Sequence, residues 1–259
     1  MKARRNSEPC ILALDIGNTS ALAGLFCGKV LKRKARLKTS EIAGRFLKIL
    51  RNQLPMKRVE AAVISSVVPA ASSYLRKAIP RSFGIKTHLI GRDILAPIAN
   101  RYRDPSQVGI DRLMNAVAAV KICKPPLVII DFGTAITFDV VSRRGEYLGG
   151  VIAPGIEISL DSLYQRTALL PKIRLAHPRA LIGKDTVESI RVGCTYGIGG
   201  LCDRVLSGLK RALGESPRVI ATGGYASFMR RYCKGIRRIE PDLTLEGIRR
   251  TYELFKKHA

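Results

Sequence analysis

The stretch LVIIDFGTAIT at residues 127–137 repeats the plan of an earlier stretch, ILALDIGNTS at residues 11–20. In each, an apolar run rich in β-forming residues ends on an aspartate, Asp15 or Asp131, and a glycine follows two residues later. Four apolar residues without helical periodicity predict a buried strand. A glycine just beyond the strand lets the backbone turn back sharply. The sequence therefore predicts two strand-and-turn units of the same design.

Hydroxyl and amide side chains follow each aspartate, namely Asn18 and Thr19 in the first turn and Thr134 and Thr137 in the second. Backbone N–H groups and hydroxyls can hold phosphate oxygens while a carboxylate positions a metal ion. One such turn carries little information, because tight turns of this composition are common. Two copies, each on its own buried strand, favour two half-domains that face one anionic ligand over two unrelated turns.

The composition is that of a globular chain with room for one large or two small domains. It has 259 residues, of which 46% are apolar and 25% charged, and this balance is not typical of disordered proteins. No apolar run reaches the length of a membrane span. The basic start at residues 1–5 is followed by the break at residues 6–9 and then by Asp15, so we expect no signal peptide, no membrane association and a cytoplasmic location.

The cysteines and histidines exclude several kinds of site. The six cysteines, at positions 10, 27, 123, 194, 202 and 233, form no C-x-x-C pair, and we expect them to be reduced, buried thiols. There are three histidines, with no H-E-x-x-H motif, and no G-x-S-x-G motif is present. A zinc hydrolase and a Ser-His triad are therefore not favoured. Any catalysis must use carboxylates, hydroxyls and bound cations.

The net charge of +25 is unusually high and is spread over scattered basic pairs and one denser run at residues 32–38. A basic surface attracts anions, whether a nucleotide, an acidic metabolite or a nucleic acid. No helix-turn-helix, zinc-finger or RNA-recognition signature accompanies the charge. We therefore favour a solvated basic surface over a nucleic-acid-binding function.

Strand and helix patterns alternate along the chain. Residues 21–37 predict two strands, and a helical pattern and another strand follow before Pro69 opens a further helix. This alternation indicates an α/β fold with a mostly parallel sheet flanked by helices. The pair Pro125-Pro126 marks a natural domain boundary.

The segment at residues 102–123 predicts a helix with a carboxylate of interest. Asp104, Pro105 and Gln107 have the order of a helix start with a capping box. Asp111 then lies about 100° around the helix from Ile110, at the border between its buried and exposed faces. A carboxylate at this border is either an ion-pair residue or a general base, and the spacing does not choose between them.

Seven ordered motifs between residues 11 and 255 make the chain resemble the type III pantothenate kinases, a family of the acetate and sugar kinase, actin and chaperone ATPase superfamily. The motifs are DIGNT at 15–19, Tyr102 followed by GIDR at 109–112, DFGTA at 131–135, GGVIAPG at 149–155, DT at 185–186, ATGG at 221–224 and LTLEG at 243–247.

The resemblance implies an α/β fold of two actin-like (ribonuclease H-like) domains with a central cleft, and a homodimer. The first domain would span residues 1–124, with the first phosphate loop and the general base. The second would span 125–259, with the second phosphate loop and a final helix able to pack back on the first domain. The implied reaction is transfer of the ATP γ-phosphoryl group to pantothenate, giving 4'-phosphopantothenate in the first step of coenzyme A biosynthesis.

The resemblance also implies residue roles. Asp111 resembles the general base, Asp131 the ligand of a monovalent cation, K⁺ or NH₄⁺, and Asp15 would lie near Mg²⁺, directly or through water. The implied ATP-binding residues are Asp15, Ile16, Gly17, Asn18, Thr19, Ser20, Ala21, Leu22 and Thr134. Those implied for pantothenate are Tyr102, Gly109, Ile110, Asp111, Arg112 and Thr186. Gly223 and Gly224 would lie near adenosine.

Phosphoryl transfer fits the residues without the resemblance, since it asks a protein mainly to align donor and acceptor and to neutralise phosphoryl charge. One departure concerns Asp185, which stands where the family usually has asparagine; an extra carboxylate facing an anionic substrate would weaken its binding. Two alternatives remain. One is a non-catalytic regulatory protein of the same fold that binds nucleic acid, and the other is a kinase or phosphatase for another small substrate.

Overall fold

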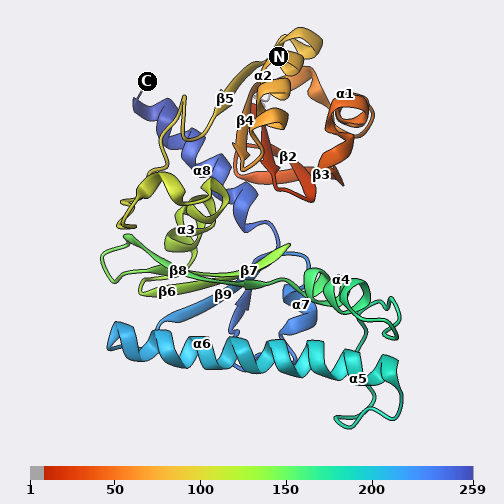
Figure 1. Ribbon diagram of the computed structural model, residues 1–259. Helices are drawn as coiled ribbons and strands as arrows, with labels where there is room; N and C mark the ends of the chain where they lie inside the picture. The colour runs from red at the N-terminus through yellow and green to blue at the C-terminus, as the bar shows by residue number, and fades with distance from the viewer. Residues whose placement is uncertain (1–8, 259) are drawn as a thin grey trace, which may run out of the picture. The chain divides into compact units, whose positions relative to one another are not determined.

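The computed structural model describes residues 9–258, which form two compact units (Figure 1). Unit 1 contains residues 9–98, 104–118 and 243–258, and unit 2 contains residues 99–103 and 119–242. The basic start at residues 1–5 lies outside the described range. No helix within residues 9–258 is long and apolar enough to cross a membrane.

Unit 1 is built on a five-stranded sheet in the order β3-β2-β1-β4-β5. Its strands are β1 (Cys10–Ile16), β2 (Ser20–Cys27), β3 (Val30–Lys38), β4 (Val59–Ser66) and β5 (Lys86–Leu89). Strands β1, β2 and β3 pair antiparallel, whereas β4 pairs parallel with β1 and β5 parallel with β4. All residues of β1 except Asp15 are buried, which explains its continuous apolar run.

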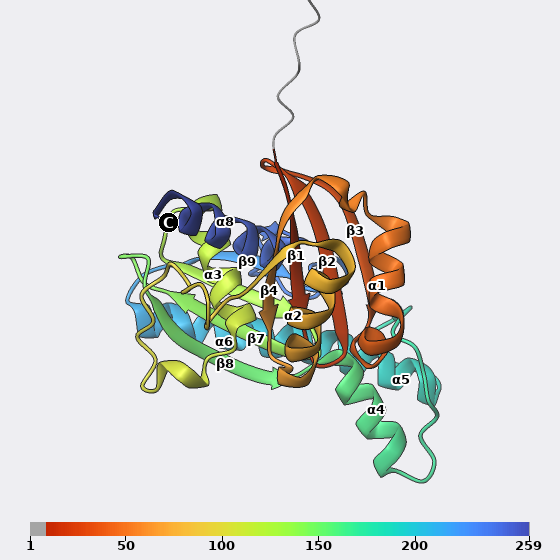
Figure 2. The same ribbon diagram turned by 90° about the horizontal axis from the view of Figure 1, so that it is seen from above.

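Two helices, α1 (Ile42–Gln53) and α2 (Pro69–Phe83), cover one face of this sheet and share a core with it. The other face packs against α8 (Leu243–His258) (Figure 2). A Cβ added to Gly24 of β2 would lie 2.8 Å from Cδ1 of Leu245. Unit 1 also contains residues 110–118 of the helix α3 (Ile110–Ile122).

Unit 2 repeats the design with a sheet in the order β10-β9-β6-β7-β8. Its strands are β6 (Leu127–Phe132), β7 (Ala135–Val141), β8 (Tyr147–Pro154), β9 (Arg218–Thr222) and β10 (Arg238–Ile239). Read from β8, the order matches that of unit 1, with three antiparallel strands followed by two parallel ones. The predicted repeat of two strand-and-turn units is therefore a repeat of two whole sheets.

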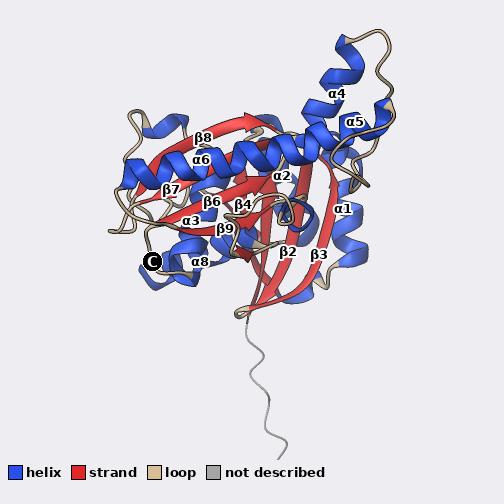
Figure 3. Cartoon of the chain, turned by 90° about the horizontal axis from the view of Figure 1, so that it is seen from below, coloured by secondary structure: helices blue, strands red, loops and turns tan. Residues whose placement is uncertain are grey.

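The helices of unit 2 are α4 (Ile156–Arg166), α5 (Thr186–Val192), α6 (Ile198–Leu213) and α7 (Ala226–Met229). The long helix α6 crosses the sheet (Figure 3), and Cys202 and Leu206 on it share a core with Val128 and Ile130 of β6. A glycine-rich run separates α5 from α6. It forms a π-helical turn, η4 (Gly193–Gly197), and brings Gly199 against the backbone of Tyr232.

Three sequence predictions are wrong. A mostly parallel sheet was expected, but each sheet is mixed, because its first three strands fold as antiparallel hairpins and only two pairings are parallel. The helix predicted to start at Asp104 is a single 3₁₀ turn, η3 (Pro105–Gln107), and the chain is extended at Val108 before α3 begins at Ile110. Cys10 and Cys27 form a disulfide, whereas six free thiols were expected; they are paired residues on β1 and β2. The other four cysteines are free.

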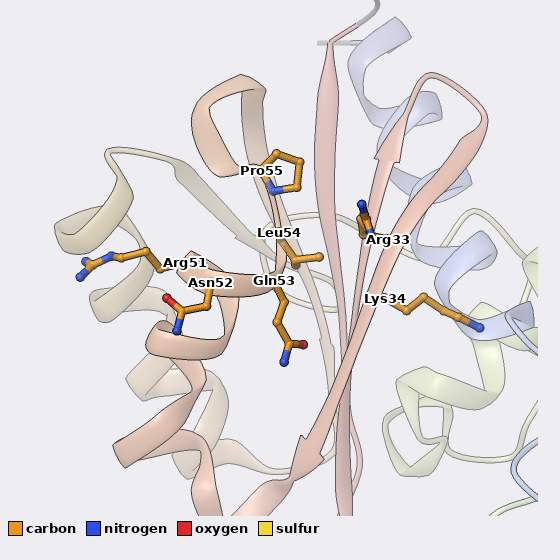
Figure 4. A pocket seen from close by; sticks show the side chains of 7 residues that line it. All are labelled: Arg33, Lys34, Arg51, Asn52, Gln53, Leu54 and Pro55. Atoms are coloured by element: carbon orange, nitrogen blue, oxygen red, sulfur yellow. The ribbon is translucent and has the colours of Figure 1, made fainter.

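A basic groove lies beside β3 (Figure 4), with a cavity volume of about 630 Å³. Its lining residues are Arg33, Lys34, Arg51, Asn52, Gln53, Leu54 and Pro55, none of which was predicted as a site residue. β3 stands at the edge of the sheet, and its exposed Lys and Arg residues discourage pairing with the strand of another chain. The charge of residues 32–38 therefore has a structural explanation.

Candidate functional site

The first predicted phosphate loop is the tight turn between β1 and β2. Asp15 is the last but one residue of β1 and pairs with Leu22 across the hairpin. The backbone N–H of Gly17 donates to the carbonyl of Ser20 at 3.0 Å and closes the turn. A Cβ on Gly17 would lie 3.3 Å from that carbonyl oxygen, so a side chain there would crowd the turn.

Thr39, at the end of β3, anchors this turn from the side. Its hydroxyl Oγ1 donates to the carbonyl of Gly17 at 2.6 Å, and its backbone N–H donates to the carbonyl of Thr19 at 3.0 Å. Sequence reasoning missed Thr39. The residue follows the edge strand by only one position, but no local pattern shows that the strand returns to the turn.

The second predicted phosphate loop has the same construction. Asp131 is the last but one residue of β6 and pairs with Thr137 of β7. The backbone N–H of Gly133 donates to the carbonyl of Ala135 at 3.2 Å. The prediction of two matching acid-tipped turns on buried strands is therefore confirmed for residues 15–20 and 131–135.

Two glycines from distant motifs leave room around this second turn. A Cβ on Gly155 would overlap the carbonyl of Thr134, and one on Gly223 would overlap the carboxylate of Asp131. Gly223 also has a φ of +89°, a conformation that favours glycine. The GGVIAPG and ATGG motifs therefore each supply a glycine against which the second turn packs.

Asp111 lies in the first turn of α3 and is partly buried. Its Oδ1 accepts a hydrogen bond from the backbone N–H of Arg112 at 2.9 Å. Burial raises the pKa of the Asp111 carboxyl, and this effect outweighs the opposing influence of that hydrogen bond and of the Arg112 guanidinium. A carboxylate with a raised pKa is a better proton acceptor, so this geometry suits a general base.

The start of α3 lies at the same sheet edge as the first turn. A Cβ on Gly109 would lie 2.5 Å from Oδ1 of Asp111 and 3.6 Å from Cγ1 of Val67, the residue just beyond β4. β4 is the parallel neighbour of β1, which carries Asp15 near its end. Unit 1 therefore brings Asp15 and Asp111 to one edge, and Gly109 makes space for the Asp111 carboxylate.

Ile16, Ala21 and Ile110 belong to unit 1, whereas Tyr102 and Thr186 belong to unit 2. The ring of Tyr102 lies over Gly149, where an added Cβ would be 3.0 Å from Cδ2 of the ring, and the φ of Gly149 is +119°. Thr186 is the first residue of α5 and is exposed. Asp131 and Thr134 are in this unit as well. The central cleft that would bring the two units' residues together stays a prediction.

Comparisons with known proteins show the family. The family model described as type III pantothenate kinase matches residues 11–208. The type III pantothenate kinases of Moorella thermoacetica and Geobacter sulfurreducens are 38% and 40% identical to this chain, over 94% of this chain and 98% of each relative. This chain belongs to the type III pantothenate kinase family.

Solved structures share the fold at low sequence identity. One is a Campylobacter jejuni protein described as a putative Baf family transcriptional activator, with a TM-score of 0.64 and 20% identity. The match covers 95% of this chain and 100% of that protein's chain. A polyphosphate/ATP-glucomannokinase from Arthrobacter matches 97% of this chain and 100% of its own with a TM-score of 0.51 and 12% identity. The chain therefore has the α/β fold of the actin-like sugar kinases.

The departure from the family pattern at Asp185 does not disturb the local structure. Oδ1 of Asp185 accepts a hydrogen bond from the backbone N–H of Glu188 at 2.8 Å and so caps α5. Asparagine caps helices equally well. Aspartate in place of asparagine therefore adds a negative charge next to Thr186 without altering the helix start.

Proposed function

We propose that this protein transfers the γ-phosphoryl group of ATP to the primary hydroxyl of pantothenate, giving 4'-phosphopantothenate at the start of coenzyme A biosynthesis. The observation that carries the proposal is the identity of 38–40% with type III pantothenate kinases over 94% of the chain. The matching acid-tipped turns and the partly buried Asp111 support it from the structure.

In this proposal the two turns hold the triphosphate. Asn18 and Thr19 of the first turn and Thr134 of the second supply amide and hydroxyl groups to phosphate oxygens. Since phosphoryl transfer places charge on the equatorial oxygens, fixed donors lower its barrier without covalent chemistry. The hydrogen bonds of Thr39 keep the first turn in one conformation for this task.

Asp111 orients the acceptor hydroxyl and takes its proton late in the transfer. The neighbouring Arg112, whose side chain is buried, pairs with the substrate carboxylate. Tyr102 and Thr186 complete the pantothenate contacts. Gly149 supports this role because its missing side chain lets the Tyr102 ring lie close to the β8 backbone.

Two cations belong to the proposal. Mg²⁺ that is bound with ATP takes one or two carboxylates together with substrate phosphates and water. Asp15 is the carboxylate for Mg²⁺. Asp131 holds K⁺ or NH₄⁺, and the missing Cβ of Gly223 leaves space beside its carboxylate. These ions supply charge neutralisation of the phosphoryl oxygens.

A homodimer in the cytoplasm is the proposed state. The helix α4 exposes three large apolar residues, Ile158, Leu163 and Tyr164, with exposed fractions of 45%, 36% and 46%. The turn η4, which contacts α4, adds Tyr196 at 47%. Large apolar side chains exposed in this way are suited to burial against another chain, and in this proposal the partner is a second copy. Light scattering should give a dimer, and Tyr164→Glu should shift it to monomer.

The function is tested by ADP release from purified protein with ATP, Mg²⁺ and K⁺, offering pantothenate beside other small alcohols. Turnover with pantothenate alone is expected. Turnover with another alcohol would assign a different substrate, and tight duplex binding at physiological salt without ATP turnover would favour the nucleic-acid regulator. Equal rates in K⁺ and in Na⁺-only buffer would remove the role of Asp131.

A further inference from the structure

Ser65 carries a buried hydroxyl that the roles above do not use. It is the last but one residue of β4, is 0% exposed, and its Oγ makes no hydrogen bond to any described residue. A buried polar group without a partner costs free energy of folding, so such groups need an explanation. The nearby buried Ser72 differs, since its hydroxyl donates to the carbonyls of Pro69 and Val68 at 3.0 and 3.3 Å.

The sheet register places Ser65 beside Asp15. The two residues are direct partners in the parallel pairing of β1 and β4. Partners in neighbouring strands lie about 4.8 Å apart and carry their side chains on the same face of the sheet. The adjacent residues Leu14 and Ile64 point to the opposite face, into the core with α1 and α2. Ser65 and Asp15 therefore share the face that lies away from that core.

The same strand end also leads to the predicted general base. Val67, two residues beyond Ser65, lies close to Gly109 at the start of α3. Asp111 follows Gly109 by two residues. The end of β4 therefore lies beside both the end of β1, which carries Asp15, and the first turn of α3, which carries Asp111.

We propose that the Ser65 hydroxyl is a positioning residue that hydrogen-bonds a water of the Mg²⁺ shell held at Asp15 with ATP. The proposal rests on the function proposed above. Mg²⁺ gives up its waters reluctantly and usually keeps several of them. Outer-shell partners that fix such ligands often matter nearly as much as the ligands themselves. A serine hydroxyl can both accept from a bound water and donate to another oxygen.

The competing explanation is that position 65 needs only a small side chain, so that helices can approach this face. The two explanations differ in what alanine does. If size alone matters, Ser65→Ala keeps cation affinity unchanged. If the hydroxyl binds the water shell, Ser65→Ala weakens cation binding while the folded protein without ligands stays at least as stable, because an unpartnered hydroxyl has been removed.

The experiment measures Mn²⁺ affinity by electron paramagnetic resonance, with Mn²⁺ in place of Mg²⁺ and a non-hydrolysable ATP analogue bound. Ser65→Ala is expected to weaken Mn²⁺ binding about tenfold, at the lower end of the effect of losing an outer-shell partner. The matched control Ser72→Ala removes a buried hydroxyl that is already bonded to helix carbonyls, and Mn²⁺ affinity should not change. Thermal unfolding of the ligand-free variants is measured in parallel.

Wild-type Mn²⁺ affinity in Ser65→Ala would overturn the assignment. If that variant does not fold, Ser65→Cys is measured in its place, because it keeps the volume but is a weak hydrogen-bonding group, and the same loss of affinity is expected. Failure of the proposed function would look different, because the wild-type protein itself would then show no nucleotide-dependent Mn²⁺ binding.

Discussion

The substitution Asp111→Asn should raise stability while it removes turnover. Burial holds the pKa of the folded Asp111 carboxyl above its unfolded value, which is about 3.9. The ionised carboxylate is therefore disfavoured in the folded protein, and stability is lost as pH rises from the unfolded pKa to the folded one. Each unit by which the folded pKa exceeds the unfolded pKa lowers the free energy of unfolding at neutral pH by about 1.4 kcal/mol.

Asparagine removes this cost and keeps the local geometry. Its side-chain oxygen can still accept the 2.9 Å hydrogen bond from the backbone N–H of Arg112. The free energy of unfolding at pH 7 should therefore be higher in Asp111→Asn than in the wild type. The gain should disappear below about pH 4, where the wild-type carboxyl is protonated in both states.

Turnover should fall because the base is gone. General base catalysis contributes roughly 10²–10⁴-fold, or about 2.7–5.4 kcal/mol of barrier, so kcat should fall at least about a hundredfold while ATP binding is retained. The acidic limb of the wild-type kcat/KM profile should lie above the ordinary carboxyl value of about 3.9, because the Asp111 pKa is raised.

The assays are denaturant unfolding at pH 7 and pH 3.5, and ADP release across pH. Asp203→Asn is the matched control, since Asp203 accepts hydrogen bonds from the backbone N–H groups of Gly235 and Lys234 at 3.2 and 3.3 Å. It should lose about 1–3 kcal/mol of stability and keep its turnover. Near-normal turnover in Asp111→Asn, or lower stability at pH 7, would refute the reasoning.

Three further outcomes are expected. Gly149→Ala should displace the Tyr102 ring and raise KM for pantothenate several-fold more than it lowers kcat. It should also cost about 1–3 kcal/mol of stability, because φ is positive at this position. An unchanged KM would remove Tyr102 from the substrate site. Cys10→Ser should lower stability by up to about 3 kcal/mol, because the disulfide to Cys27 is lost. A thiol titration of the denatured, unreduced wild-type protein should find four thiols; six would show that the disulfide is absent. Asp185→Asn should lower KM for pantothenate without changing stability, whereas Asp185→Ala should cost about 1 kcal/mol of stability through the lost helix cap. Equal KM values in the wild type and both variants would show that the Asp185 charge does not face the substrate.

The two acid-tipped turns could be predicted because their signals are local. A buried strand is visible as an apolar run, and the glycine two residues after Asp15 or Asp131 requires a turn within the same few residues. The predicted helix is present as α3, but its predicted start at Asp104 was wrong, because Pro105 and a capping pattern describe one turn of helix as well as several. Only the extended backbone at Val108 separates them.

The supporting residues could not be predicted because they act across the sheet. The pairing of Cys10 with Cys27 depends on the register of the hairpin, which the spacing of 17 residues does not give. Thr39 reaches the first turn only because β3 runs antiparallel to β2 and ends beside it. Ser65 becomes notable only when β4 is placed next to β1.

The place of α8 in unit 1 affects how the protein is made. This helix is the last element of the described chain, yet it buries Leu245 and Ile248 in the unit that contains β1. During synthesis the first sheet emerges from the ribosome early and must wait, with one apolar face incompletely covered, until residues 243–258 have been translated. A nascent chain stalled before residue 243 would consequently be a target for chaperones, however well its second sheet had folded.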